Sequence, residues 1–146
     1  IITTEETPFA IGKAQLFFTP KEKAQVGIIA IGALVYNAII AARELEAEGV
    51  YATVMNLGTV KPIDEEAVIV LAKETGALVT VEEHQIACGM GSAVAEALAQ
   101  HQPAPMEFVG VHDAFGQSGE PNELIEHYGM GVNHIKEAVK KVIVRK

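Results

Sequence analysis

The stretch that decides the fold is Val79–Glu96, which reads VTVEEHQIACGMGSAVAE. It begins as an apolar strand, passes through a polar turn and a pair of glycines, and ends as the start of a helix. A second polar, glycine-punctuated stretch, Asp113–Glu120 (DAFGQSGE), follows another apolar run. Both place polar residues where a strand ends, which is the edge that usually holds ligands in an open α/β sheet.

The composition is that of one well-packed domain without a nucleic-acid or membrane role. The chain has 146 residues, 49% of them hydrophobic and 5% aromatic, with a formal net charge of -8. The acidic balance and the absence of a basic patch argue against nucleic acid as a partner. No apolar run reaches the roughly 18 residues of a membrane span. The single cysteine, Cys88, excludes an internal disulfide and fits a reducing compartment such as the cytoplasm.

Residues 1–12 are polar and extended, with Pro8 and Gly12 as punctuation, and they lack the features of a signal peptide. We expect them to form a linker from a preceding domain, and residues 13–146 to form the folded domain.

The rest of the chain alternates between expected strands and expected helices. The strand signals are Lys13–Phe18, Val26–Ile31, Tyr51–Asn56, Leu78–Val81 and Met106–Val111. The helix signals are Leu34–Glu48, a helix capped by Asp64 that runs to Thr75, Ser92–Ala99, Glu120–Tyr128, and a last helix capped by Asn133. Such alternation with short connections predicts a largely parallel sheet covered by helices on both faces.

Three groups of residues at the strand ends are candidates for chemistry. His84 beside Glu83, and His112 beside Asp113, could act in acid–base work, although a solvated or interface turn explains them better. The Gly89–Ser92 turn could expose backbone N–H groups to an anion, but it lacks the third glycine of a dinucleotide motif, and close packing is the simpler explanation. Cys88 has no assigned base and reads as an inert thiol.

No complete catalytic motif occurs in the sequence. A phosphate-binding Walker loop, a GxSxG elbow and an HExxH helix are all missing. The residues therefore predict an α/β domain with a polar edge, and they assign no reaction to that edge.

From about Phe9 onward, the chain resembles the C-terminal domain of transketolase, and more narrowly the separately encoded C-terminal section of split transketolases. The matching stretches occur in the family's order along the chain. They are Ile11–Ala14, Leu57–Asp64, Val81–His84 with Gly89–Val94, and Asp113–Gly119 running on to Tyr128–Gly129. The pair Cys88–Gly89 departs from the Gly-Gly usual in the family.

The resemblance implies a three-layer α/β/α fold with a mixed five-stranded sheet, order 1-3-2-4-5, strand 1 antiparallel. It implies ketol transfer between sugar phosphates with thiamine diphosphate and Mg²⁺. These cofactors would be held by the preceding pyrophosphate- and pyrimidine-binding domains, and the enzyme would be a homodimer. The Gly-Asp-Gly motif and the activating Glu belong to those domains, so no catalytic, cofactor-binding or metal-binding residue is expected here. The fragment alone should be inactive.

With that strand order, the switch point of the sheet falls between Gly32–Ala33 and Glu83–His84, which is where a groove is expected. The residues expected at an interface or groove are Gly32, Glu83, His84, Gln85, Gly89, Gly91, Ser92, Asp113, Phe115 and Ser118.

Other functions stay open from the sequence. Deoxyxylulose-phosphate synthases share the Val-Thr-x-Glu-Glu strand, although the run Phe115–Gly119 favours transketolase. The β subunits of 2-oxo-acid dehydrogenases use such a domain to dock an acyltransferase core. A free-standing nucleotide-binding regulator could use Gly89–Ser92.

Overall fold

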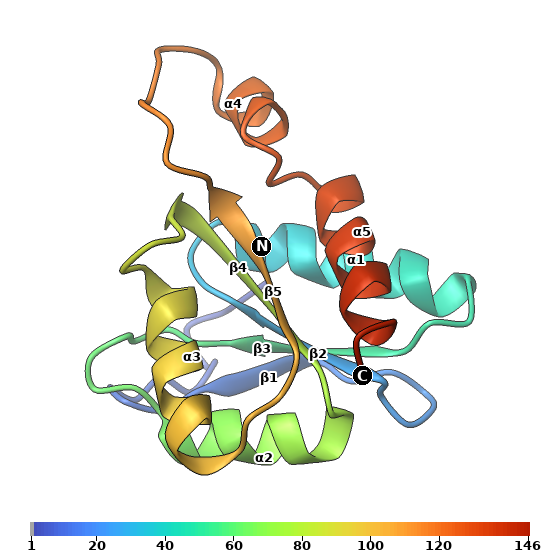
Figure 1. Ribbon diagram of the computed structural model, residues 1–146. Helices are drawn as coiled ribbons and strands as arrows, with labels where there is room; N and C mark the ends of the chain where they lie inside the picture. Colours follow the sequence, from blue (N-terminus) through green and yellow to red (C-terminus); the bar gives the residue numbers. More distant parts are fainter. Residues whose placement is uncertain (1) are drawn as a thin grey trace.

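The computed structural model describes residues 2–146 as an α/β/α sandwich (Figure 1). Its strands are β1 (Gln15–Phe18), β2 (Val26–Ala30), β3 (Ala52–Asn56), β4 (Leu78–Gln85) and β5 (Met106–Val111). Its helices are α1 (Leu34–Ala47), α2 (Glu65–Thr75), α3 (Met90–His101), α4 (Pro121–His127) and α5 (Val132–Ile143). No helix among the described residues is long and apolar enough to cross a membrane.

The five strands form one sheet in the order β1-β3-β2-β4-β5. The pairs β2–β3, β2–β4 and β4–β5 are parallel, and β1 runs antiparallel to β3 at one edge. The predicted fold class, strand order and orientation of the first strand are therefore confirmed.

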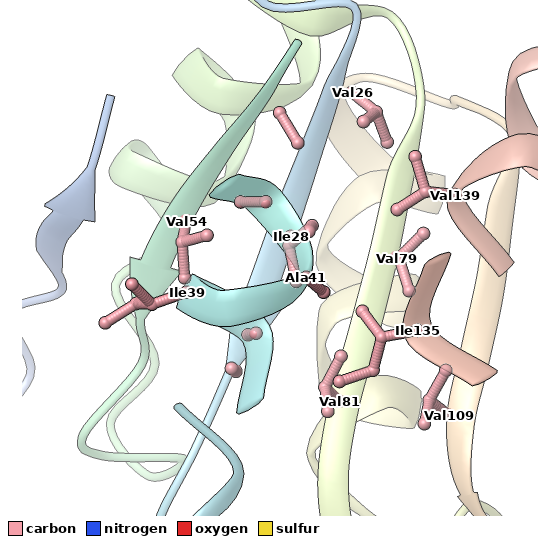
Figure 2. Packing of buried hydrophobic residues seen from close by; sticks show 14 of the residues in the cluster. Val26, Ile28, Ile39, Ala41, Val54, Val79, Val81, Val109, Ile135 and Val139 are labelled. Carbon is pink, nitrogen blue, oxygen red and sulfur yellow. The ribbon is translucent and has the colours of Figure 1, made fainter. Parts of the chain in front are cut away.

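The larger core lies between the sheet and helices α1 and α5. Strand side chains Ile28, Val54, Val79 and Val109 point at this layer, and all four are almost completely buried. Figure 2 shows them facing Ile39 and Ala41 of α1 and Ile135 and Val139 of α5. A strand such as β2, which is buried at every position, needs apolar residues throughout, and this explains the continuous run Val26–Ala30.

The opposite face of the sheet is covered by α2 and α3 (Figure 1). Ile29 and Met55 from the strands pack there against Leu71 of α2 and Leu98 of α3. Because consecutive strand residues point to opposite faces, Ile28 and Ile29 serve the two cores in turn.

Asp64 fixes the start of α2, as the sequence predicted. Its Oδ1 accepts a hydrogen bond from the backbone N–H of Ala67 at 3.3 Å, which satisfies one of the free donors of the first helical turn. Its Oδ2 accepts a second bond from the backbone N–H of Ala14 at 2.9 Å. One buried carboxylate thus joins the helix to the chain entering the edge strand.

Beyond shifts of one residue, the structure differs from the expected elements at four places. Strand β1 begins at Gln15 rather than at Lys13. Strand β4 extends to Gln85, beyond the apolar residues, so His84 lies within the strand rather than after it. Helix α3 spans Met90–His101 and is longer at both ends than Ser92–Ala99. The expected cap at Asn133 is wrong, because the extended residue Gly131 precedes the first helical residue, Val132.

Candidate functional site

A shift of register between β4 and β5 shapes the carboxyl edge of the sheet. Val81 pairs with Val109, but the next pair is Gln85 with Val111. Between these two pairs β4 advances by four residues, while β5 advances by only two. An irregularity of this kind bends a strand and changes where its side chains point. It lies at Glu82–His84, the polar part of the sequence motif.

A concave pocket of about 340 Å³ lies at the switch point between β2 and β4. It is small for a ligand site, since such sites are commonly about 300–1,000 Å³. Its walls combine the end of β2, the bulged part of β4 and the turn before α3. The residues that matter below are Gly32, Val60, Glu83, His84, Cys88 and Gly89.

Glu82 forms the floor of this edge and is only 3% exposed. Its two carboxylate oxygens accept hydrogen bonds from the backbone N–H groups of Met90 at 2.6 Å and Gly91 at 2.8 Å. These are the free donors at the start of α3, where a negative charge is favoured by the helix dipole. The side chain of Glu82 therefore occupies the position that a bound anion would take at this helix.

The two glycines of the turn are explained by close packing around that carboxylate. A Cβ at Gly89 would overlap the Glu82 carboxylate. A Cβ at Gly91 would lie 2.6 Å from Thr80 Oγ1 and 2.8 Å from Phe108 Cδ1. The Met90 and Gly91 N–H groups that an anion would need at the Gly89–Ser92 turn are already bonded to Glu82, which argues against the anion-binding turn and against the nucleotide-binding regulator that would use it.

Ser92 and Cys88 belong to the same turn. The Ser92 hydroxyl accepts a hydrogen bond from the Cys88 N–H at 3.0 Å and donates one to the Ile86 carbonyl at 2.9 Å. Cys88 has a φ of 62°, which is uncommon for a residue other than glycine, and its thiol is exposed. Ser92 thus holds the turn, while Cys88 faces the pocket.

Gln85 connects the pocket edge to the loop after β5. Its Nε2 donates to the Ala114 carbonyl at 2.8 Å, and its Oε1 accepts from the Asp113 N–H at 3.0 Å. The Tyr128 hydroxyl donates to the Phe115 carbonyl at 2.8 Å. Three hydrogen bonds therefore fix consecutive residues of a loop that extends away from the sheet (Figure 1).

Histidines contribute less to the edge than the sequence suggested. The His84 ring shares a 2.8 Å hydrogen bond with the Gln85 carbonyl, and the side chain is exposed on the pocket wall. His112 is exposed at the end of β5. His101 and His134 approach Glu65 and Glu126, each at 3.7 Å, so both make surface ion pairs when protonated. His127 stacks edge-on against Tyr128.

The residues present do not fit thiamine diphosphate or its divalent cation. The helix start that could cradle a diphosphate is filled by Glu82. Within residues 2–146 no group of three or more His, Cys, Asp or Glu side chains is placed to hold a metal ion. No step of the chemistry is therefore assigned to this edge.

The structure brings together four of the ten predicted residues, Gly32, Glu83, His84 and Gly89, around one pocket. Gln85 and Asp113 meet through a hydrogen bond, and Gly91 and Ser92 are structural parts of the turn. Phe115 and Ser118 are exposed in the loop.

The sequence analysis did not predict that Glu82 caps α3, that Tyr128 bonds to the Phe115 carbonyl, or that Val60 lines the pocket. A signal for Glu82 existed, since two glycines near a helix start indicate that a neighbouring group needs their space.

The fold and the geometry of this edge define the class of protein. It is a three-layer α/β domain in which Glu82 and the Gly89–Ser92 turn hold the structure together. The family model of the transketolase C-terminal domain matches residues 17–135. The chain belongs to that family.

Two relatives and one solved structure show how the chain compares with longer proteins. A 6-deoxy-6-sulfo-D-fructose transketolase subunit from Clostridium sp. (strain MSTE9) is 43% identical over 145 residues, 99% of this chain and 44% of the relative. A 1-deoxy-D-xylulose-5-phosphate synthase from Heliobacterium modesticaldum is 44% identical over 128 residues, 88% of this chain and 18% of the relative.

A solved structure described as a split gene transketolase, inactive beta4 tetramer, superimposes with a TM-score of 0.91 at 40% identity. The match covers 99% of this chain and 46% of the other. This chain thus spans less than half the length of these proteins.

Proposed function

We propose that the chain is the C-terminal domain of a transketolase that transfers ketol units between sugar phosphates with thiamine diphosphate and a divalent cation. The cofactors are held by pyrophosphate- and pyrimidine-binding domains, to which residues 1–12 connect. In this role the chain supports the assembly and supplies no catalytic group. The enzyme works in the cytoplasm, in pentose phosphate metabolism.

The position of Glu82 carries this proposal. A domain that bound a phosphorylated ligand at its sheet edge would keep the start of a helix free for it. Here the Glu82 carboxylate bonds to Met90 and Gly91 instead. The similar transketolase subunit and the similar split-gene chain are both more than twice as long as this chain, which leaves ample sequence in such proteins for a cofactor site.

Assembly is the second part of the proposal. The split-gene transketolase chain with 40% identity is described as a tetramer of one kind of chain. We extend self-association to this protein, with the homodimer as its basic unit. The contact residues proposed are those that the pocket and the exposed loop present. They are Gly32, Glu83, His84, Gly89, Asp113, Phe115 and Ser118, with Gln85 bonded to the loop and Gly91 and Ser92 holding the turn behind them.

Complementation tests the proposed function. The purified chain should give no ketol transfer with thiamine diphosphate and Mg²⁺, and activity should appear when the two preceding domains are co-expressed with it. The substrate panel contains sugar phosphates and 6-deoxy-6-sulfo-D-fructose, because a similar subunit is named for the latter. Turnover by the chain alone, or failure of the domains to bind it, would overturn the proposal.

A deoxyxylulose-phosphate synthase is the second candidate, because a synthase of that name is 44% identical over 128 residues. The same reconstituted enzyme decides between the two candidates. The product separates them, because a 1-deoxy-D-xylulose-5-phosphate synthase is named for the product that it makes, whereas a transketolase transfers a ketol unit between sugar phosphates.

A further inference from the structure

We infer that two copies of this chain associate by exchanging Phe115: the ring of each copy enters the pocket at the β2–β4 switch point of the other. This inference rests on the self-association part of the proposed function, and it names the surface. Phe115 is 100% exposed. An aromatic ring left wholly in water forgoes the favourable burial that large apolar side chains normally obtain.

The loop that carries Phe115 is held in place rather than free. Gln85 bonds to the backbone of Asp113 and Ala114, and Tyr128 bonds to the carbonyl of Phe115 itself. Figure 1 shows this loop, between β5 and α4, extending away from the body of the domain. A fixed, protruding ring loses little conformational freedom on binding, which is the property of a good interface anchor.

The receiving surface is the pocket of about 340 Å³. Ile31, Val60 and Met90 give it apolar walls, and Val60 is 37% exposed. At the floor of the pocket, the carboxylate oxygens of Glu82 already accept hydrogen bonds from the first N–H groups of α3. What remains is a concave, partly apolar surface without a free helix end to attract an anion, which suits a ring better than a phosphate.

The placement of ring and pocket favours a second copy as the occupant. His84 lines the pocket, and the next residue, Gln85, is bonded to Ala114, the neighbour of Phe115. Ring and pocket therefore lie beside each other on one edge of the sheet. In a two-fold dimer, a residue that contacts a partner site must have its own site contacted in return. One surface that carries both an anchor and a pocket meets that condition.

The single cysteine makes this arrangement directly testable. Cys88 is exposed and lies on the pocket wall. In the variant Phe115→Cys, the new thiol should reach Cys88 of the other copy, and mild oxidation should give a dimer linked by two disulfides. A disulfide needs Cβ atoms within about 3.5–4.5 Å, so its formation reports close contact. Mass spectrometry of the non-reduced digest should find the peptides of positions 88 and 115 joined.

Two control variants make the outcome unambiguous. Phe115→Cys with Cys88→Ser should not cross-link, and Val144→Cys, at a position that is 85% exposed elsewhere, should cross-link to Cys88 much more slowly. The inference is overturned by a dimer that persists in the Cys88→Ser background, since that would join two copies of the loop. A disulfide within one chain, or no disulfide at all, overturns it as well.

Sedimentation of the unoxidised protein gives an independent measure. Phe115→Ala should weaken dimerisation about tenfold or more, as the loss of an interface anchor does, and Val144→Ala should change it by less than about twofold. If Phe115→Ala leaves the dimer intact while the reconstituted enzyme stays active, this inference fails and the proposed function stands. If reconstitution fails while cross-linking succeeds, the proposed function fails instead.

Discussion

The carboxylate of Glu82 accepts a 2.6 Å hydrogen bond from the backbone N–H of Met90, so that a strand residue caps the helix that follows it. The second oxygen accepts from Gly91 at 2.8 Å. Two charge-assisted bonds made by a buried group should matter strongly for stability, because their loss leaves backbone donors buried without a partner.

Glu82→Ala should therefore lower the free energy of unfolding by about 2–4 kcal/mol. Glu82→Gln should lower it by roughly 2 kcal/mol, because the amide keeps one acceptor and points its own donors at the helix. Urea denaturation measures both variants. The matched control is Glu83→Gln, whose exposed side chain should change stability by less than about 0.5 kcal/mol. Equal effects at positions 82 and 83 would show that the cap contributes nothing.

Gly91→Ala tests the close approach of α3 to the sheet. In an open helical position this change stabilises by up to about 1 kcal/mol. Here the new Cβ would lie 2.6 Å from Thr80 Oγ1 and 2.8 Å from Phe108, so overpacking should outweigh the gain and destabilise by about 1–3 kcal/mol. Gly116→Ala is the control, since its Cβ would meet nothing within 4 Å. A stabilising Gly91→Ala would mean that the helix moves away freely.

How much of this edge could be read from the sequence depends on whether the signal is local. The buried strand Val26–Ala30 and the Asp64 cap were predictable, because apolar periodicity and capping need only neighbouring residues. The strand order came from the family resemblance and is confirmed. The edge after β4 was recognised as polar, and its glycines as sites of close packing.

Alternation along the strand places Glu82 on the same face as Leu78 and Thr80, which is the face that α3 covers. The sequence could not predict that its carboxylate reaches the N–H groups of Met90 and Gly91, because that contact depends on how α3 packs on the sheet. The Asn133 cap was wrong for a related reason. Capping preference is worth about 1 kcal/mol, and the packing that buries Ile135 and Val139 decides where α5 begins.

Gln85→Glu should break one of the two hydrogen bonds by which this side chain holds the loop after β5, and it should keep the other. The carboxylate still accepts from the Asp113 N–H, but it repels the Ala114 carbonyl to which the amide donated. Losing one such bond should make the backbone of residues 114–118 more mobile, so that their order parameters fall, with Asp113 much less affected. Nuclear magnetic resonance relaxation of the backbone amides measures this.

Gln100→Glu provides the control for that experiment. Its amide donates to the Glu96 carbonyl on the exposed side of α3, far along the chain from the loop. It changes the net charge equally, so the order parameters of the loop should stay at their wild-type values. If both variants loosen the loop alike, charge rather than the Gln85 clamp is responsible.

The lowered pKa of Glu48 predicts that part of the free energy of unfolding depends on pH in the acidic range. Hydrogen bonds from Lys136 and then Lys140 lower the pKa of Glu48 from 4.5 to about 2. The distances are 2.9 Å and 2.6 Å, and together these pairs tie α5 to α1. A carboxyl whose folded pKa is depressed stabilises the fold above its unfolded pKa, and this contribution disappears as the pH falls through the folded value.

The wild type should accordingly exceed Glu48→Gln in stability at pH 6, and the gap should narrow from about pH 4.5 downward and close near pH 2. Because Glu48 and Lys140 are exposed, the gap should also shrink in 1 M salt. Denaturation curves of both proteins from pH 2 to 6 measure it, with Glu137→Gln, at an acidic position of α5, as a control. A gap that is constant across this range would mean that Glu48 is not held by the two lysines, since an unpaired carboxylate has no reason to favour the folded state.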